Sequence, residues 1–501
     1  MIEQLLIGFQ AALTLSNLLF IFCGIALGII FGVLPGLGSV TAIAIMIPVT
    51  FYMSPMSAIG FLVGINKGGT SGGAIPAILI NAPGTPESTA TTRDGYPLTK
   101  KGMPEKAMKM ALYSSATGDM FSDAVLILLA APFATVALMF GPAEITSIII
   151  FAFTLIAALS GRSLVKGITA AAFGVFLSTI GLDPVTGGQR MSFNVIDLYD
   201  GISLNSLAIG TLALSSVLSQ LFDLRRKSKT RTDPIRFSDL DRDRQRLTFS
   251  EYFGCFRTIL RSAFIGTGVG MLPGLGVTLA AFLGYGAAKR ASKNPEKFGT
   301  GALEGIAATE AANSAVVGSN LIPTIALGIP GNIVAALLIG AFMIHGVTPG
   351  PMMMQAHGHL IYAIFASMLM ANVAHVIVGR IGIRIWGQVT RVPQAIVLPI
   401  VIPLCIAGVY IPSHSLFEVG LMFAFAALAY VMRKTGFSLV SLLIGFLLGP
   451  MLEFSLRQAL ILYKGDWTIF FGKPIALVFF ALTVAFLWRF AWKPAKLTGN
   501  G

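Results

Sequence analysis

The stretch GVLPGLG at residues 32–38 decides the fold, because nearly the same stretch, GMLPGLG, returns at residues 270–276. Six of the seven residues are identical in the two copies. Each copy places one proline and three glycines inside an apolar segment. Proline has no amide hydrogen and cannot continue the helical hydrogen-bond ladder, so both copies predict a broken helix.

A second pair of motifs repeats in the same order. PAILINAPG at residues 76–84 corresponds to PTIALGIPG at residues 323–331, and at this offset Asn66 falls on Asn313. Two ordered motifs in each half indicate a duplication of roughly 200 residues. We expect a first repeat at 1–222, a basic linker at 223–250, the core of the second repeat at 251–372, and C-terminal membrane helices completing the second half or a scaffold at 373–501.

The composition indicates that lipid, rather than water, surrounds most of the chain. Of 501 residues, 55% are hydrophobic and only 11% are charged, which leaves too little polar surface for water-soluble domains. Apolar stretches long enough to cross about 30 Å of hydrocarbon recur, and their number predicts roughly twelve spans. The expected fold is an all-α polytopic integral membrane protein with broken helices or re-entrant hairpins. Its three cysteines are scattered singly, which is typical of small buried side chains.

The net charge of +13 reflects membrane topology rather than nucleic-acid binding, because lysine and arginine remain on the cytoplasmic side. Residues 225–247 carry nine basic side chains and predict a cytoplasmic linker. In the first half, the loop after the first Pro-Gly motif (50–57) is uncharged, and the loop after the second carries five basic residues between 93 and 109. In the second half the order is reversed: four basic residues lie between 289 and 297 after the first motif, and none lies between 345 and 355 after the second. Equivalent loops therefore lie on opposite sides, which is typical of the inverted repeats of secondary transporters.

The four Pro-Gly breaks predict the substrate site. Irregular backbone is tolerated at membrane depth where it is buried or lines a wet cavity. Freed helix N-termini attract anions, and freed carbonyl groups are available to Na⁺. Amide and hydroxyl side chains beside the breaks suit a carboxylate or a sodium ion, although some will only bridge helices. The substrate-binding candidates are Pro35, Gly36, Gly38, Asn66, Lys67, Thr70, Ser71, Asn81, Gly84, Thr85, Gly274, Gly276, Asn313, Ser314, Asn320, Gly331 and Asn332.

Four charged residues within apolar segments are further candidates. A cation such as Lys67 costs about 2.5–3.5 kcal/mol at the centre of a membrane helix, so it needs a partner or a function. Lys67 is interpreted as a counter-charge to a substrate carboxylate, as the occupant of a cation site, or as a residue that extends to the interface. Glu310 is interpreted as a cation ligand, a proton carrier or the partner of Lys67. Asp119 and Asp123, one helical turn apart, are candidates for carrying a proton or for an inter-helix contact.

The motifs of catalysis and nucleotide binding are missing from the sequence. Residues 32–38 lack the Gly-Lys-Ser/Thr ending of a phosphate-binding loop, and HExxH does not occur. The Gly-x-Ser-x-Gly spacing at residues 69–73 lies inside an apolar segment, without the strand–turn–helix context of a nucleophile elbow. We therefore expect a protein that is not an enzyme and that has no cofactor. Energy for transport then comes from a sodium or proton gradient, or from a separate subunit.

These motifs closely resemble the large membrane subunit of the tripartite tricarboxylate transporters. The blocks that match are residues 32–38, 72–86, 94–97, 271–276, 310–313 and 327–331. The resemblance implies an inner-membrane permease that imports small carboxylates with a sodium or proton gradient, by an elevator-like movement. It also implies two partners, a small four-span membrane subunit and a periplasmic solute-binding protein. Alternatives are a carrier that works without a binding protein and a channel for organic anions. Lys67 departs from the family, whose members usually have a neutral residue there.

Overall fold

The computed structural model describes residues 2–34, 36–160, 163–183, 185–224, 243–390, 392 and 394–492. Within these ranges the chain is mostly helical, and its one sheet pairs β1 (Gly181–Leu182) with β2 (Gln189–Arg190). Seven helical segments of the described chain are long and apolar enough to cross a membrane, and five shorter apolar helices accompany them. The chain is therefore an all-α multi-pass membrane protein, whereas the number of twelve spans stays a prediction.

The first half begins with helices that surround the first Pro-Gly break. These elements are α1 (Ile2–Ala12), α2 (Leu15–Val33), α3 (Gly38–Met46), η1 (Ile47–Tyr52), α4 (Pro55–Gly72), α5 (Ala74–Ile80), η2 (Pro86–Thr89) and α6 (Thr92–Lys100). Longer helices follow them, namely α7 (Pro104–Ala137), α8 (Pro142–Ser160), α9 (Leu164–Ser178), η3 (Ile196–Leu198), α10 (Leu204–Ala208), η4 (Ile209–Leu214) and α11 (Ser215–Leu224).

The second half has a similar order around its own break. Its elements are α12 (Phe249–Gly254), α13 (Phe256–Gly270), α14 (Gly276–Ala291), η6 (Pro295–Lys297), α15 (Leu303–Ser319), α16 (Leu321–Leu327), α17 (Ile333–Ile344) and α18 (Met353–Ala356). The remaining helices are α19 (Gly358–Val389), α20 (Gln394–Ser413), α21 (Leu416–Thr435), α22 (Leu439–Leu462), α23 (Ile469–Gly472) and α24 (Pro474–Trp492).

The two longest helices of the described chain, α7 and α19, each pack against helices of the other half. Helix α7 packs against α13 and α15 of the second half, whereas α19 packs against α1, α2 and α4 of the first half. Small residues permit these close contacts, since a Cβ on Gly118 of α7 would lie 2.4 Å from the carbonyl oxygen of Ala311 in α15. Residues far apart in sequence therefore meet where α4, α7 and α19 come together.

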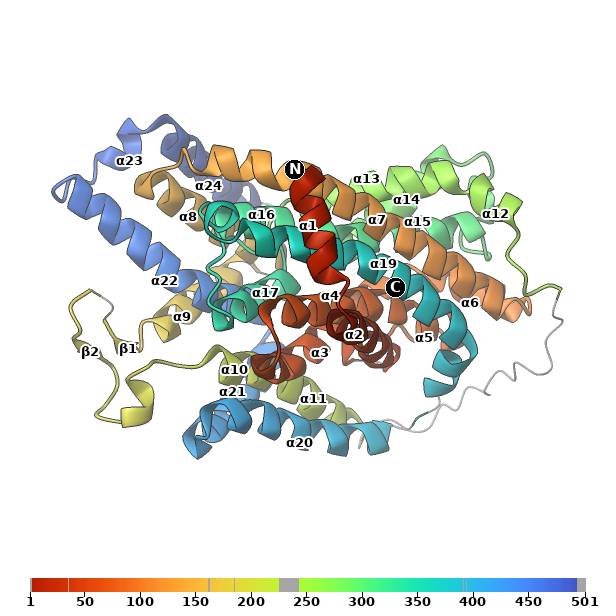
Figure 1. Cartoon of the computed structure of the whole chain (residues 1–501), viewed down its shortest axis with the longest axis horizontal. Helices are drawn as coiled ribbons and strands as arrows, with labels where there is room; N and C mark the ends of the chain where they lie inside the picture. Colours follow the sequence, from red (N-terminus) through yellow and green to blue (C-terminus); the bar gives the residue numbers. More distant parts are fainter. Residues whose placement is uncertain are drawn as a thin grey trace.

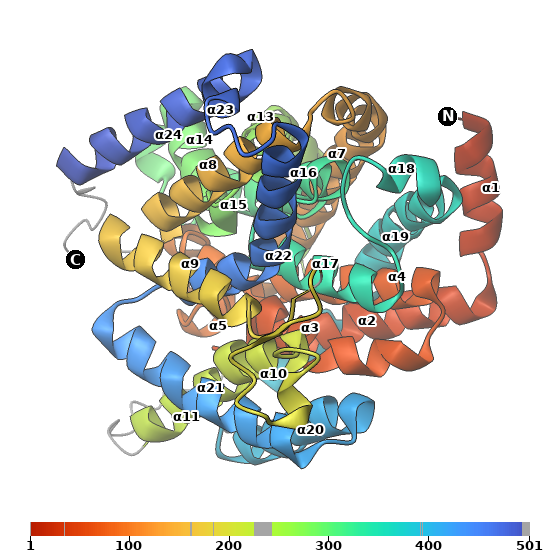
Figure 2. The ribbon, with the colours of Figure 1, turned by 90° about the vertical axis from the view of Figure 1, so that its left-hand side faces the viewer.

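The other helices form two groups. Helices α8 and α9 pack with α22, and α24 packs on α8, whereas α10, η4 and α11 pack with α20 and α21. Figure 2 shows α20 and α21 on one side of the molecule and α23 and α24 on the opposite side. Helix α3 packs against η4, so the first break lies beside the group that contains α21.

The two ends of the molecule are formed by different elements. Figure 1 shows α6 and α12 at one end and β1, β2 and α23 at the other. At the α6 end, the Gln245 side chain donates to Gly102 and accepts from the amide of Glu105, and Arg384 donates to Glu105. The basic stretch 93–109 lies at this end, and its Asp94 contacts Gly299 and Gly301, which follow the basic stretch 289–297, as expected if both face the cytoplasm. Most of the predicted linker, residues 225–242, lies outside the described residues, and the predicted domain boundaries stay predictions.

Candidate functional site

The two Pro-Gly motifs of the first half, at residues 35–36 and 83–84, are together called the first break, and those of the second half, at 273–274 and 330–331, the second break. The first break joins the turn between α2 and α3 to the loop that follows α5. The amide of Gly36 donates to the carbonyl of Gly84 at 3.4 Å, and the amide of Gly84 donates to the carbonyl of Gly73 at 3.1 Å. A Cβ on Gly84 would lie 2.0 Å from the carbonyl oxygen of Gly32. Gly36 also has a φ of 85°, which favours glycine. The motif therefore needs glycine at these positions to bring two loops together.

The second break repeats this connection. The amide of Gly274 donates to the carbonyl of Gly331 at 2.9 Å, and the φ angles of Gly274 and Gly276 are 85° and 72°. Each Pro-Gly motif is therefore hydrogen-bonded to the other motif of its own half. Pro35, which was predicted to take part in the site, lies outside the described residues.

A cavity of about 420 Å³ opens beside the first break, within the 300–1,000 Å³ typical of small-molecule sites. Its wall is built from the start of α3, the loop that follows Gly84, helix α11, and single residues of α17 and α21. The main polar lining residues are Gly36, Gly38, Ser39, Thr41, Gly84, Thr85, Glu87, Ser216, Ser219, Gln220 and Arg433. Helix α3 begins at Gly38 without a side-chain cap, so its first amide groups lack helical partners at the cavity wall.

Four sequence-predicted residues meet at this cavity, namely Gly36, Gly38, Gly84 and Thr85. Sequence reasoning missed Arg433, in the last turn of α21, and Glu87, which lies in η2. It also missed Ser216 and Gln220 of α11, whose side chains both donate to the carbonyl of Gly36.

The other predicted residues lie elsewhere. Asn66 and Thr70 are buried within α4, Gly274, Gly276 and Gly331 form the second break, and Asn81 ends α5 in a left-handed conformation. Asn332 caps α17 by accepting from the amide of Ala335. Ile333 follows Asn332 and borders the cavity, so the second half also reaches it. Both polar side-chain atoms of Asn320 are buried without a hydrogen-bond partner among the described residues.

Lys67 lies in a buried group of polar side chains, here called the charge cluster, which comprises Lys67, Asp119, Asp123, Asn372 and His375. The Lys67 ammonium donates to Oδ2 of Asp123 at 2.7 Å and to Oδ1 of Asn372 at 2.6 Å. It lies 3.7 Å from Oδ1 of Asp119. The cluster joins α4, α7 and α19, and every member is at least 98% buried. Lys67 is thus held by counter-charges of the chain itself.

Ser71 links the charge cluster to the end of α4. Nε2 of His375 lies 2.7 Å from Oγ of Ser71, and Nδ1 of His375 lies 3.6 Å from Oδ2 of Asp119. Ser71 is one helical turn beyond Lys67 on α4. The sequence indicated that Lys67 needed a partner but not which one, because Asn372 and His375 follow it by about 300 residues.

Glu310 occupies a second buried polar group, on α15. Its carboxylate accepts hydrogen bonds from the hydroxyls of Thr91 and Ser115, the latter at 3.2 Å, and from the side-chain amide of Asn313 at 3.4 Å. Ser314 in turn donates to Asn313. No lysine, arginine or histidine of the described chain forms an ion pair with Glu310. Of the three interpretations of Glu310, pairing with Lys67 is therefore not the arrangement in this structure.

A further contact joins the two halves at the basic end. Oδ1 of Asp94 accepts from the amides of Gly299, Gly301 and Ala302, at 2.8 to 2.9 Å, and Oδ2 accepts from the hydroxyl of Tyr285. Asp94 therefore binds the N-terminus of α15, where a negative charge is stabilised by the helix dipole. The loop after the first break is in this way attached to the second half.

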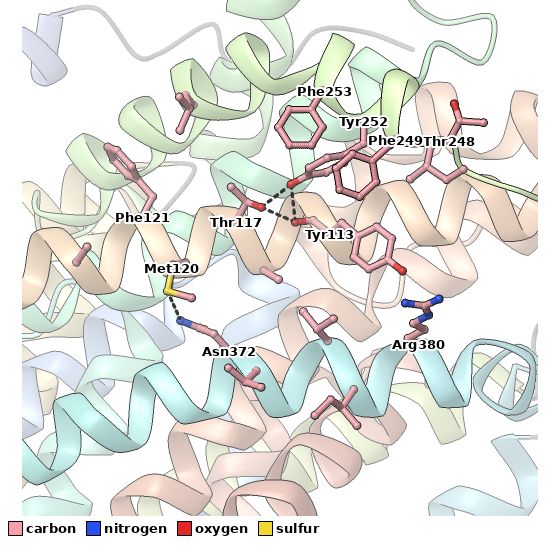
Figure 3. Close-up of a pocket in the computed structure, with 17 residues that line it drawn as sticks. Tyr113, Thr117, Met120, Phe121, Thr248, Phe249, Tyr252, Phe253, Asn372 and Arg380 are labelled. Atoms are coloured by element: carbon pink, nitrogen blue, oxygen red, sulfur yellow. Dashed lines mark hydrogen bonds between the residues drawn. The ribbon is translucent and has the colours of Figure 1, made fainter. Parts of the chain in front are cut away.

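A large apolar groove of about 970 Å³ lies between α7, α12 and α19. Figure 3 shows Asn372 and Arg380 on one wall and Tyr252, Phe249 and Phe253 across from them. Asn372 lines this groove and also binds Lys67 and Asp123. The groove thus reaches the outer side of the charge cluster.

The fold and the breaks define a multi-pass membrane protein with a broken helix in each half and a cavity beside the first break. The chain belongs to the tripartite tricarboxylate transporter TctA family, whose model matches residues 18–444. This membership places it among transport permeases and bears out the resemblance seen in the sequence.

Two relatives come from Agrobacterium vitis. One, an uncharacterised 52.8 kDa protein in the TAR-I ttuC′ 3′ region, is 35% identical over 97% of this chain and 95% of its own length. The other, an uncharacterised protein in the TAR-II ttuC′ 3′ region, is 39% identical over 42% of this chain and 87% of its own length. No solved structure is detectably similar.

Proposed function

We propose that this chain is the permease subunit of a secondary transporter that imports small carboxylates across the bacterial inner membrane. A sodium or proton gradient drives the import, with no cofactor. A small four-span membrane subunit and a periplasmic solute-binding protein complete the system. The observation that carries the proposal is the cavity at the first break, where the start of α3 meets Thr85 and Arg433.

The cavity wall has donors for more than one carboxylate. The first amides of α3, with the hydroxyls of Ser39 and Thr41, suit one carboxylate group at the positive end of the helix dipole. The Arg433 guanidinium suits a second one, because its planar donors match carboxylate geometry. Glu87 also borders the cavity and favours a substrate hydroxyl on its side over a further carboxylate. The proposed substrate is thus a small di- or tricarboxylate.

The position of the cavity suggests how access alternates. Gln220 and Arg433 lie in the second half of α11 and the last turn of α21, and α11 is followed in the sequence by the basic linker that is predicted to be cytoplasmic. We propose that the cavity opens inward in this conformation. Elevator-like movement of the α2–α5 region against α11 and α21 then exposes the site to the other side.

Arg433→Ala tests the proposed site in vesicles that contain both membrane subunits. Uptake of labelled citrate and succinate is measured with and without the binding protein, under an imposed sodium or proton gradient. Loss of Arg433 should raise the half-saturating concentration about tenfold or more, which corresponds to about 1.4 kcal/mol. Lys434→Ala is the matched control, because Lys434 is the neighbouring cation and does not line the cavity.

Three other outcomes would revise the proposal. An unchanged half-saturating concentration in Arg433→Ala would remove Arg433 from the site. Saturable uptake without the binding protein would indicate a stand-alone carrier. Flux that does not saturate would indicate a channel.

A further inference from the structure

We propose that the coupling ion is a proton, and that Asp119 and His375 bind it between α7 and α19. The inference rests on the proposed function, because a coupling ion has a role only in a carrier. It goes beyond that function by naming the ion and the two side chains that hold it.

The first argument is charge balance in the charge cluster. With neutral His375, the cluster holds one positive and two negative charges, and its side chains are at most 2% exposed. An uncompensated charge at membrane depth is costly. The groups that face the cluster are Lys67 and Ser71 from α4, Asp119 and Asp123 from α7, and Asn372 and His375 from α19. One additional proton makes the cluster neutral.

Helix α15 also packs beside the cluster, but it contributes no positive charge. Its buried carboxylate, Glu310, accepts from Ser115, one helical turn before Asp119, and forms no hydrogen bond or ion pair with a member of the cluster within the described residues. Gly318 of α15 lies so close that a Cβ would be 2.4 Å from Oδ1 of Asp123. No other ionisable side chain of the described residues forms an ion pair with a member of the cluster. The missing positive charge is therefore not supplied by a neighbouring helix.

The hydrogen bonds identify where the proton belongs. Oδ2 of Asp123 accepts from Lys67 at 2.7 Å and from Asn372 at 2.8 Å, so this carboxylate is stabilised in its charged form. Among the described residues, neither oxygen of Asp119 has a hydrogen-bond donor and Nδ1 of His375 has no hydrogen-bond partner, although all three atoms are buried. An unpaired buried polar group costs about 1–3 kcal/mol. A proton shared by Asp119 and His375 would pair Oδ2 of Asp119 with Nδ1 of His375, and Oδ1 of Asp119 would keep the Lys67 ammonium 3.7 Å away.

The distance between these two side chains permits such sharing. Nδ1 of His375 and Oδ2 of Asp119 are 3.6 Å apart, and a closer approach of less than about 1 Å brings them within hydrogen-bond range. Because His375 reaches Ser71 with its other nitrogen, the pair is oriented from α4 as well. Asp119 and His375 are therefore placed to bind one proton between them and to move closer together when they bind it.

The same contacts disfavour a sodium ion. The Lys67 ammonium already lies among the oxygens of Asp123 and Asn372 that would bind a metal cation. The carbonyls predicted to bind Na⁺ are also engaged. Gly36 accepts from Ser216 and Gln220, Gly84 from Gly36, and Gly331 from Gly274. The Lys67 ammonium thus occupies the position among these oxygens that a sodium ion would otherwise take.

Helix α4 connects the proton to the substrate. Its last residue, Gly72, precedes Gly73, whose carbonyl accepts from Gly84, and Thr85 lines the cavity. Movement of α4 with the substrate changes the Ser71–His375 contact and opens the Asp119–His375 pair to water. A protonated, neutral cluster tolerates this rearrangement better than a charged one, because an uncompensated buried charge is costly, which couples proton binding to substrate movement.

The test compares gradient-driven uptake with exchange in vesicles that hold both membrane subunits and the binding protein. Wild type should accumulate citrate or succinate with an inside-alkaline pH gradient in sodium-free buffer. Asp119→Asn and His375→Gln should reduce this accumulation about tenfold or more but retain exchange of labelled for unlabelled substrate. Asp200→Asn and His359→Gln, at exposed positions, are the matched controls and should retain both activities.

Accumulation that needs sodium and ignores the pH gradient would overturn the inference, as would pH-driven accumulation in Asp119→Asn. Infrared difference spectra of the purified protein between acidic and alkaline buffer provide a readout without transport. A protonated-carboxyl band present in wild type and absent from Asp119→Asn is expected, and a band that persists in the variant would contradict the site. Failure of both uptake and exchange in wild type, with the band intact, would overturn the proposed function and the coupling role that rests on it, but would leave Asp119 as a proton-binding residue.

Discussion

Two clusters of similar composition lie in different surroundings. The buried charge cluster combines Lys67 with Asp119 and Asp123, whereas a cluster near β1 and β2 combines two arginines with two carboxylates. In the latter, Arg457 donates to both oxygens of Asp183 at 3.0 Å, and Arg190 and Arg457 both approach Glu453 at 2.9 Å. The arginine cluster is electrically balanced, and its side chains are partly open to solvent.

The difference shows which cluster is built for stability and which for a change of state. The arginine cluster has paired charges and bidentate geometry, which give a lasting attachment of the loop to α22. The charge cluster has one excess negative charge and an aspartate without hydrogen bonds. Such an imbalance at membrane depth is costly to keep and is therefore expected at a functional position.

The largest effect should follow the loss of Lys67. In Lys67→Met the carboxylates of Asp119 and Asp123 remain buried without their cation, and breaking a buried pair in this way costs about 3–5 kcal/mol. We expect a large fall in the yield of folded protein and in its thermal midpoint in detergent. Thermal unfolding of the purified variant measures this.

A second substitution separates charge from packing. Lys67→Met combined with Asp123→Asn removes one charge of each sign and should recover much of the lost stability. If the double variant is as unstable as Lys67→Met, then the lysine stem matters for packing rather than for charge, and the ion-pair interpretation fails.

The two aspartates should respond differently when each is replaced alone. Asp123→Asn removes a carboxylate that accepts from Lys67 and Asn372, and should lower the thermal midpoint clearly, because hydrogen bonds to charged groups contribute about 1.5–3 kcal/mol. Asp119→Asn removes the unpaired charge and should leave the midpoint unchanged or slightly higher. Equal destabilisation by both variants would mean that the two carboxylates carry the same charge state.

The breaks were the part of the fold most accessible from the sequence. Pro-Gly motifs have a strong local cause, and the structure confirms that the segments they interrupt end at these points. The pairing of Gly36 with Gly84 and of Gly274 with Gly331 follows the order of the repeated motifs. The packing of α7 and α19 against helices of the other half has no such local signal, because the partners of a long apolar helix depend on packing over hundreds of residues.

The candidate site was only partly predictable for the same reason. Gly36 and Thr85 belong to the motifs and were found, whereas Arg433 lies at the end of an ordinary apolar helix, where a cation is expected from topology alone. His375 had no motif at all. Its significance comes from Ser71 and Asp119, which reach it from two other helices.

Among the substitutions expected to lower the thermal midpoint, the smallest effect should come from Asp183→Asn, in the loop at the β1–β2 end. Arg457, the amides of Val185 and Thr186, and Arg190 hold the pKa of Asp183 well below its usual range. A lowered pKa in the folded state stabilises it above the unfolded pKa of about 4, and this contribution is lost as the pH falls toward the folded value. Wild type should therefore keep a modest advantage in thermal midpoint from pH 8 to pH 5 and lose it only in stronger acid. Added salt should reduce the advantage because the arginine cluster is partly exposed. The effect of Lys67→Met on the thermal midpoint should be nearly independent of salt, because the charge cluster is buried. An equal response of both variants to salt would show that the two clusters share the same surroundings.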